Sequence, residues 1–132
     1  MTAVLLDTHV LVWSLFDRQL SAAARDAIEM ASKLLVSAVS LYEIDSKRRY
    51  ASAARAADLV PLPVDLMSFL PAAGYKLLEI TPHQAWLAAN LPFAHGDPRD
   101  RILVAQAHDL GVPLVTRDKD LRDIAGDTPV IW

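Results

Sequence analysis

Cysteine is absent from the 132 residues of this sequence, and glycine is scarce. The lack of cysteine excludes disulfide bonds, thiolate zinc sites and cysteine nucleophiles, and it suits the cytoplasm, where we expect the protein to act. The four glycines are dispersed, and none builds the glycine-rich turn with which nucleotide-binding folds hold phosphates. Use of ATP or NAD is therefore disfavoured, and any bound metal must be held by oxygen or imidazole ligands.

Long hydrophobic runs and an excess of positive charge are also lacking. The most apolar stretch, residues 3–16, is interrupted by Asp7 and His9 and follows no basic leader, so we expect neither a signal peptide nor a membrane partner. The 13 Lys and Arg residues are outnumbered by 16 Asp and Glu residues, for a net charge of −3. A nucleic-acid partner would therefore depend on local basic groups or on metal ions.

What the sequence does contain is enough apolar material for one domain over residues 1–132, since 53% of the residues are hydrophobic. Short apolar runs alternate with helical patterns along the chain. We expect strands at 3–7, 33–39, 76–80 and 112–118 and an edge strand at 128–132. We expect helices at 8–16, 22–32, 41–59, 64–73, 81–91, 98–110 and 119–124. This alternation predicts an α/β fold, a three-layer α/β/α sandwich around a central, mainly parallel sheet.

Helix boundaries are marked by the residue types that usually occupy them. Ser21, Ser40 and Thr81 precede helical patterns and are expected to be N-caps. Gly74 and Gly111 follow such patterns and are expected to end them.

Five acidic residues follow strands or begin helices in this scheme. Asp7 ends the first strand, Glu43 comes a few residues after the second, Asp97 and Asp100 begin a helix, and Asp118 follows the fourth strand. The carboxyl ends of parallel strands share one edge of the sheet, where ligands bind in open α/β folds. We therefore expect these acids on the same side of the molecule.

Helix capping is the competing explanation for most of these acids. Glu43 lies three residues after Ser40, the spacing of a capping box. Asp97 and Asp118 are suited to N-cap positions, and Asp100 is favoured in the first turn of a helix. Taken singly, capping is the more frequent role of such residues.

Asp7 is the exception, because Thr8 already offers a hydroxyl for capping. Carboxylates gathered at one edge repel one another, and a divalent cation removes that conflict. Oxygen ligands favour Mg²⁺ or Mn²⁺, because zinc prefers imidazole or thiolate and calcium takes more ligands from a dedicated loop. Magnesium usually contacts substrate phosphates as well, so the acids predict hydrolysis of a phosphoester.

Four motifs, LLDTHVLVW, SAVSLYEI, HGDPRDRILVAQA and LVTRDKDL, occur in that order. Together they resemble a PIN domain, specifically a VapC-type ribonuclease toxin of type II toxin–antitoxin pairs, over almost the whole chain. The resemblance implies that Asp7, Glu43, Asp100 and Asp118 are catalytic, metal-binding carboxylates, with Asp97 as an auxiliary ligand. Arg99 stands where relatives often carry phenylalanine, and Asp45 stands where a small residue is common.

The resemblance also implies an activity and partners. The reaction would be endonucleolytic hydrolysis of RNA by water that Mg²⁺ or Mn²⁺ activates, with Asp7 as the central ligand and Asp100 opposite it. The cognate partner would be a small antitoxin that lies over the acidic pocket, and the toxin would be a homodimer.

Four further residues are candidates for substrate binding. Arg99, Arg101 and Arg117 flank the expected ligands, and each is expected to contact RNA phosphates, with Arg99 and Arg117 favoured. Thr116 would orient a carboxylate or a water, or contact the substrate. The basic run at 47–49 is expected instead to form a solvated helix face, with Lys47 paired to Glu43.

The remaining polar and aromatic residues suggest structural roles. The four histidines lack metal-pair spacing, and only His95, close to Asp97, is a candidate for touching substrate. Four aromatic residues are expected to be core or interface anchors and not base-stacking platforms: Trp13, Phe16, Trp86 and Phe93.

Two other functions are compatible with parts of the sequence. A non-catalytic module would keep the acidic fold and use the apolar helix at 65–74 to bind a partner or a second copy. A phosphatase with Asp7 as nucleophile usually needs an acid two residues later, but position 9 is histidine.

Overall fold

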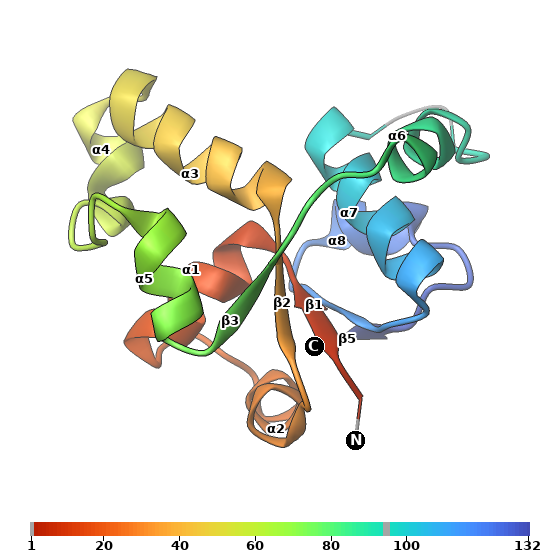
Figure 1. Cartoon of the computed structure of the whole chain (residues 1–132), viewed down its shortest axis with the longest axis horizontal. Coiled ribbons are helices and arrows are strands. Elements are labelled where there is room, and N and C mark those ends of the chain that lie inside the picture. Colours follow the sequence, from red (N-terminus) through yellow and green to blue (C-terminus); the bar gives the residue numbers. More distant parts are fainter. Residues whose placement is uncertain (1, 94–95) are drawn as a thin grey trace.

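The fold is built on a five-stranded parallel sheet in a computed structural model that describes residues 2–93 and 96–132. The strands are β1 (Val4–Leu6), β2 (Leu34–Ser37), β3 (Tyr75–Leu78), β4 (Leu114–Val115) and β5 (Val130–Ile131), in the order β3-β2-β1-β4-β5 (Figure 1). In register, Leu5 of the central strand lies opposite Leu35 and Leu114. The expected parallel sheet and its C-terminal edge strand are confirmed.

Helices connect the strands. They are α1 (Thr8–Phe16), α2 (Ala22–Met30), α3 (Ala38–Tyr50), α4 (Ala53–Ala56), α5 (Leu66–Ala72), α6 (Pro82–Ala89), α7 (Pro98–Leu110) and α8 (Lys119–Ile124), with a 3-10 turn at Ala57–Leu59 after α4. Within the described part of the chain, no helix combines the length and the apolar character needed to cross a bilayer.

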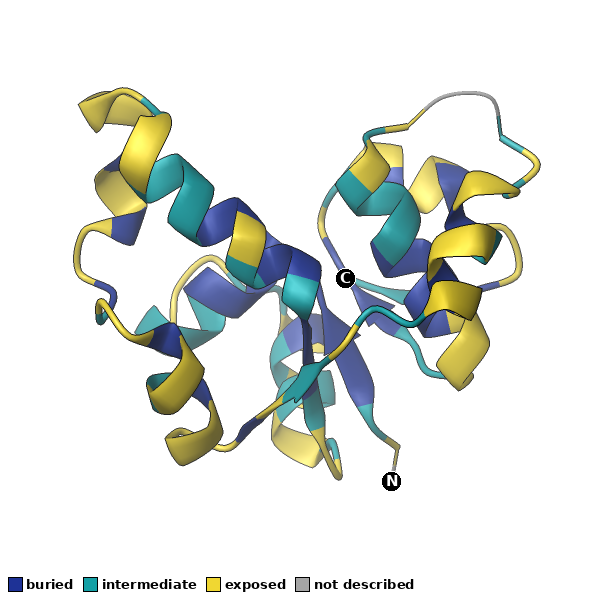
Figure 2. Ribbon diagram, turned by 45° about the horizontal axis from the view of Figure 1, so that its top comes forward, coloured by how far each residue is buried: buried dark blue, intermediate teal, exposed yellow. Residues whose placement is uncertain are grey.

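Alternating strand residues divide the core between the two faces of the sheet. Val4 and Leu6 pack on one face with apolar residues of α1, α2 and α5. Leu5 packs on the other face with residues of α7 and α8, because successive strand side chains point in opposite directions. Figures 1 and 2 show the buried strands between the two groups of helices, which confirms the three-layer α/β/α arrangement.

The helix predicted at 41–59 is wrong at its start and in its middle. Helix α3 begins at Ala38, where the Ser37 hydroxyl accepts a hydrogen bond from the Val39 amide at 3.1 Å, so Ser40 is not its cap. The second strand therefore ends at Ser37. At Ala51 the backbone becomes extended (φ −77°, ψ 161°), and the chain folds into the short helix α4.

The last two strands are shorter than the expected 112–118 and 128–132, whereas most of the other helix boundaries agree with the structure. The hydroxyls of Ser21 and Thr81 cap α2 and α6, and Gly111 ends α7 with a left-handed backbone (φ 66°). Helix α5 begins at Leu66, two residues later than expected, because Asp65 is its cap.

The strand order creates a switch point at the centre of the sheet. From β1 the chain adds β2 and β3 on one side, whereas β4 and β5 lie on the other. The connections after β1 and β4 therefore leave the sheet in different directions, and a crevice forms between their carboxyl ends. Asp7 follows β1 and Asp118 follows β4 at this crevice.

Candidate active site

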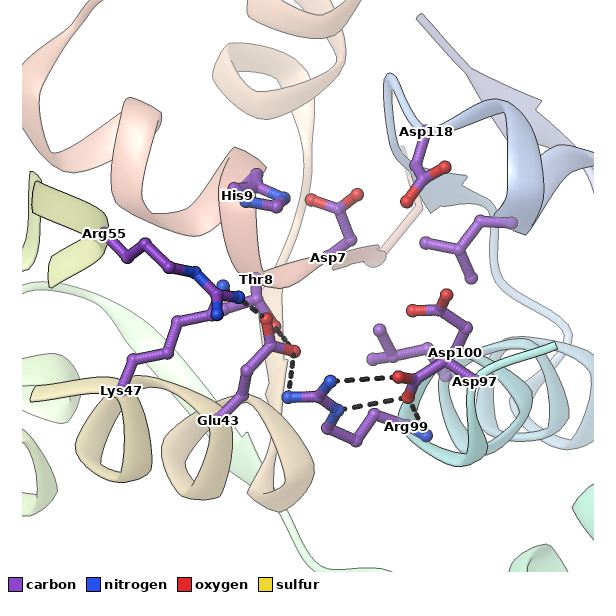
Figure 3. Close-up of a pocket in the computed structure, with 12 residues that line it drawn as sticks. Asp7, Thr8, His9, Glu43, Lys47, Arg55, Asp97, Arg99, Asp100 and Asp118 are labelled. Atoms are coloured by element: carbon purple, nitrogen blue, oxygen red, sulfur yellow. Dashed lines mark hydrogen bonds and ion pairs between the residues drawn. The ribbon is translucent and has the colours of Figure 1, made fainter. Parts of the chain in front are cut away.

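All five predicted acids line one polar pocket at the carboxyl ends of the strands. Its volume is about 220 Å³, and its acidic residues are Asp7, Glu43, Asp97, Asp100 and Asp118. Figure 3 shows their carboxylates directed toward a shared space from α1, α3, α7 and the start of α8. The topology thus brings together residues from the beginning, middle and end of the sequence.

The Asp7 carboxylate is buried and accepts hydrogen bonds from one backbone amide and one side-chain hydroxyl. Its Oδ1 accepts from the Val10 amide at 2.7 Å and caps α1, and its Oδ2 accepts from the Thr116 hydroxyl. The expectation that Asp7 gains little from capping is wrong, because the Thr8 hydroxyl turns toward α3 instead. Burial raises the pKa of Asp7, against the lowering effect of these hydrogen bonds.

Asp100 also has a strongly perturbed carboxyl group. It lies in the first turn of α7, half-buried. Burial raises its pKa to about 7, and the negative charges of the other four acids add to the effect. A carboxylate in this position is destabilised unless positive charge arrives from elsewhere.

Asp97 is paired with an arginine inside the pocket. It caps α7 by accepting from the Arg99 amide at 2.8 Å. The Arg99 guanidinium also donates to both of its oxygens, at 3.1 and 2.9 Å, and lowers the pKa of Asp97. The same guanidinium lies 3.9 Å from Glu43 Oε1, so Arg99 bridges two of the acids.

Glu43 faces the pocket from α3, and its partners are not those of a capping box. Its Oε2 lies 3.2 Å from the Lys47 ammonium, as expected, and its Oε1 lies 3.2 Å from the Thr8 hydroxyl. The capping-box alternative is wrong, because Ser40 is buried within helix α3 and contacts the Thr8 hydroxyl at 3.0 Å. Asp45 points elsewhere and pairs with arginines of its own helix.

The acids therefore divide into two groups. Glu43 and Asp97 form ion pairs within 4 Å, whereas in the described part of the chain Asp7, Asp100 and Asp118 do not. The unpaired group offers only carboxylate oxygens, the ligands that Mg²⁺ and Mn²⁺ prefer. Over the same residues, no three potential ligands are close enough to form a ready-made metal site. The donor set fits a hard cation that keeps several of its waters.

The predicted substrate contacts have different surroundings. Thr116 is fully buried, and its hydroxyl bonds Asp7, so the structure gives it a positioning role in place of a substrate contact. Arg117 is exposed beside the pocket, 5.8 Å from the centroid of the Trp13 ring. The expectation that Arg101 contacts phosphates is wrong, because its guanidinium donates to three carbonyl groups within residues 88–93.

Two residues of the pocket wall, Arg55 and His9, were not predicted from the sequence. Arg55 reaches the pocket from α4 only because helix α3 ends before Ala51, and the residues around this break carry no strong helix-ending signal. His9 also lines the pocket, and its position two residues after Asp7 could have indicated this. His95, the histidine selected from sequence, lies outside the described residues.

The expected core role of the aromatic residues holds for three of the four. Trp13, Phe16 and Phe93 are partly buried and pack against the two halves of the core. Trp86 is 75% exposed, so its assignment to the core is wrong. Its place on the outer surface of α6 leaves the alternative role, an interface anchor, as a prediction.

Comparisons with known proteins agree with this geometry. The PIN domain family model matches residues 4–127. Ribonuclease VapC22 from Mycobacterium tuberculosis is 37% identical over 137 residues, with the whole of both chains covered.

Solved structures of low sequence identity share the fold. DNA-bound VapBC from Salmonella typhimurium aligns with a TM-score of 0.69 at 15% identity, covering 98% of this chain and 97% of that one. VapBC-5 from Mycobacterium tuberculosis aligns with a TM-score of 0.65 at 18% identity, covering 98% and 96%. The family model and the full-length relative together show that the chain belongs to the PIN domain family, with VapC-type proteins among its relatives.

Proposed function

We propose that the protein is a metal-dependent endoribonuclease and the toxin of a toxin–antitoxin pair. A full-length relative is named a ribonuclease, and several proteins of the same fold were solved as VapBC or toxin–antitoxin complexes. We propose further that it acts in the cytoplasm as a homodimer, that a small cognate antitoxin covers the acidic pocket, and that RNA is the substrate.

The observation that carries the proposal is the unpaired carboxylate group at the switch point. Asp7, Asp100 and Asp118 would hold Mg²⁺ or Mn²⁺, with Glu43 and Asp97 completing the shell directly or through water. Bound there, the ion supplies Lewis-acid stabilisation of the charge that develops on phosphoryl oxygens, and a site for the attacking water.

Residues of the chain itself contribute position and charge. The Thr116 hydroxyl donates a hydrogen bond to the Asp7 carboxylate and accepts one from the Asp118 backbone amide at 3.0 Å. One side chain therefore holds the Asp7 carboxylate and the backbone of Asp118 on the two sides of the crevice. Lys47, Arg55 and Arg99 give one wall of the pocket positive charge, which suits the phosphates that flank a cleavage site. A side-chain nucleophile is not needed, and the phosphatase alternative is disfavoured because position 9, where that chemistry usually needs a second acid, is His9.

The test is incubation of the purified protein with total RNA, with and without Mg²⁺ or Mn²⁺, followed by mapping of the cut sites. We expect metal-dependent cleavage by the wild type and none by Asp7→Asn, which keeps a residue able to cap α1. Asp26→Asn, an exposed change on α2, is the matched control and should cleave normally. Full activity of Asp7→Asn would refute the assignment. Absence of both cleavage and stabilisation by Mg²⁺ in the wild type would favour the non-catalytic interaction module.

A further inference from the structure

A second hollow adjoins the acidic pocket and has a different chemical character. Its volume is about 260 Å³, and it is lined by Asp7, His9, Trp13, Arg117 and Asp118. Two of the unpaired acids, Asp7 and Asp118, together with His9, belong to both hollows. A group bound in the second hollow would therefore lie directly beside the site of phosphodiester cleavage.

The wall of this hollow is an ordered aromatic stack. His9 and Trp13 lie one turn apart on α1, and their rings are stacked with centroids 5.7 Å apart and planes inclined by 27°. Trp13 is held from the core side, where the Trp132 ring lies at 5.8 Å. The Arg117 guanidinium lies 5.8 Å from the Trp13 centroid, so a cation borders the same ring.

His9 is the accessible member of this stack. It is exposed, whereas Trp13 is half-buried and the neighbouring positions of α1, Thr8 and Val10, are buried. An exposed imidazole that rests on an anchored indole offers a flat surface without the entropy cost of ordering a mobile side chain.

We propose that the exposed His9 ring, backed by the partly buried Trp13, forms a stacking subsite for one nucleobase of single-stranded RNA, next to the scissile phosphodiester, with Arg117 at its edge. This inference rests on the proposed ribonuclease function and extends it to a determinant of sequence or structure preference. Proteins that recognise RNA splay unpaired bases onto aromatic rings, including histidine, and onto guanidinium groups. The hollow is smaller than the roughly 300–1,000 Å³ of sites that bury a drug-sized ligand, so it suits one flat ring system.

The walls of the hollow also favour a base over a phosphate in this position. Asp7 and Asp118 are assigned to the metal that meets the scissile phosphate, so the rest of the hollow is bounded by the His9 and Trp13 rings, which suit a flat base. Arg117, on the exposed side, is then free to meet the phosphate that follows the stacked base.

The experiment is a double-mutant cycle that combines substitutions of His9 in the protein with abasic positions in the RNA. The probe is a 12-nucleotide RNA spanning a cut site mapped with the wild type, prepared intact and with an abasic residue at each position near the cut. Binding is measured by fluorescence anisotropy in the Asp7→Asn background, so that the RNA is not cleaved. Each RNA is tested against that background alone and with His9→Ala, His9→Phe or His9→Gln added.

We expect one abasic position to weaken binding to the reference protein by about 5- to 150-fold, the range for loss of a base–aromatic stack. The same abasic change should cost little in His9→Ala or His9→Gln, and its effect should persist in His9→Phe, which keeps an aromatic ring. His83→Ala is the matched control, because His83 is an exposed histidine on α6 whose Nε2 lies 3.4 Å from a carboxylate oxygen of Asp109. It should behave as the reference.

Equal weakening of intact and abasic RNAs by His9→Ala would overturn the stacking subsite while leaving the ribonuclease proposal in place. Loss of the abasic effect in His9→Phe as well as in His9→Gln would overturn it too, because the imidazole would then act by hydrogen bonding. A wild type that cuts no RNA would overturn the proposed function, and this inference with it.

Discussion

Replacing Asp100 by asparagine should make the metal-free protein more stable above neutral pH, although it removes a carboxylate proposed to bind metal. The pKa of Asp100 is raised from 3.8 to about 7, so between these values the folded state binds more protons than the unfolded state. The free energy of unfolding therefore falls as pH rises from about 4 to about 7. Asparagine, which cannot ionise, does not carry this cost.

The size of the stability gain follows from the pKa shift of Asp100, reduced by solvent screening and by the lost interaction with the helix dipole. A shift of about three pKa units corresponds to a ceiling of about 4 kcal/mol. Asp100 is only half-buried, and solvent screening reduces this to about 2 kcal/mol. Loss of a negative charge at the N-terminus of α7 removes up to about 1 kcal/mol of favourable interaction with the helix dipole. We expect a net gain of roughly 1 kcal/mol at pH 8 and almost none at pH 4.

Urea unfolding in EDTA, followed by tryptophan fluorescence at pH 4, 6 and 8, measures this difference. Asp26→Asn removes the same charge from an exposed site on α2 and controls for net charge. Adding Mg²⁺ should stabilise the wild type and reverse the advantage of Asp100→Asn, because only the folded site binds the ion. The reasoning is refuted if Asp100→Asn is destabilised at pH 8, or if its effect is the same at all three pH values.

The remaining predictions concern the groups that hold or compensate the acids. Thr116→Val should lower the free energy of unfolding by about 1–3 kcal/mol in urea titrations, because the buried hydroxyl that donates to Asp7 is lost. Thr116→Ser keeps a hydroxyl and should retain most of the stability, and equal losses in the two variants would contradict the positioning role. Arg99→Ala should bind Mn²⁺ several-fold more tightly in calorimetry, since two acids lose their cation, and should flatten the salt dependence of RNA binding by about one unit of slope. Arg99→Lys is its control, and an unchanged salt slope in Arg99→Ala would count against an RNA contact. Gly111→Ala should cost about 1 kcal/mol, because the residue that ends α7 has φ of 66°, and an unaltered unfolding midpoint would show that the helix end relaxes.

The sequence predicted the fold well because its signals are local. Alternating apolar runs and helical patterns predicted the α/β class and the parallel sheet, and hydroxyl or glycine residues marked most helix ends. The error at 41–59 arose where two serines compete. Ser37 and Ser40 both suit a helix start, and only the tertiary contact of Ser40 with Thr8 decides between them.

The gathering of the acids was predictable from topology, but their pairing was not. Asp7, Asp97 and Asp118 each cap a helix through one carboxylate oxygen while lining the pocket, so capping does not exclude a place in the pocket. Whether Arg99 points into the pocket or away from it depends on rotamers and on the spacing of α3 and α7. These are properties of the packed structure that a single sequence does not encode locally.

Crystals of the protein grown with Mn²⁺ and measured at an anomalous wavelength test the central claim most directly. The account predicts a strong anomalous peak among the carboxylates of Asp7, Asp100 and Asp118, and its loss in Asp7→Asn. A well-ordered structure without a peak there, at Mn²⁺ concentrations that support RNA cleavage, would contradict it.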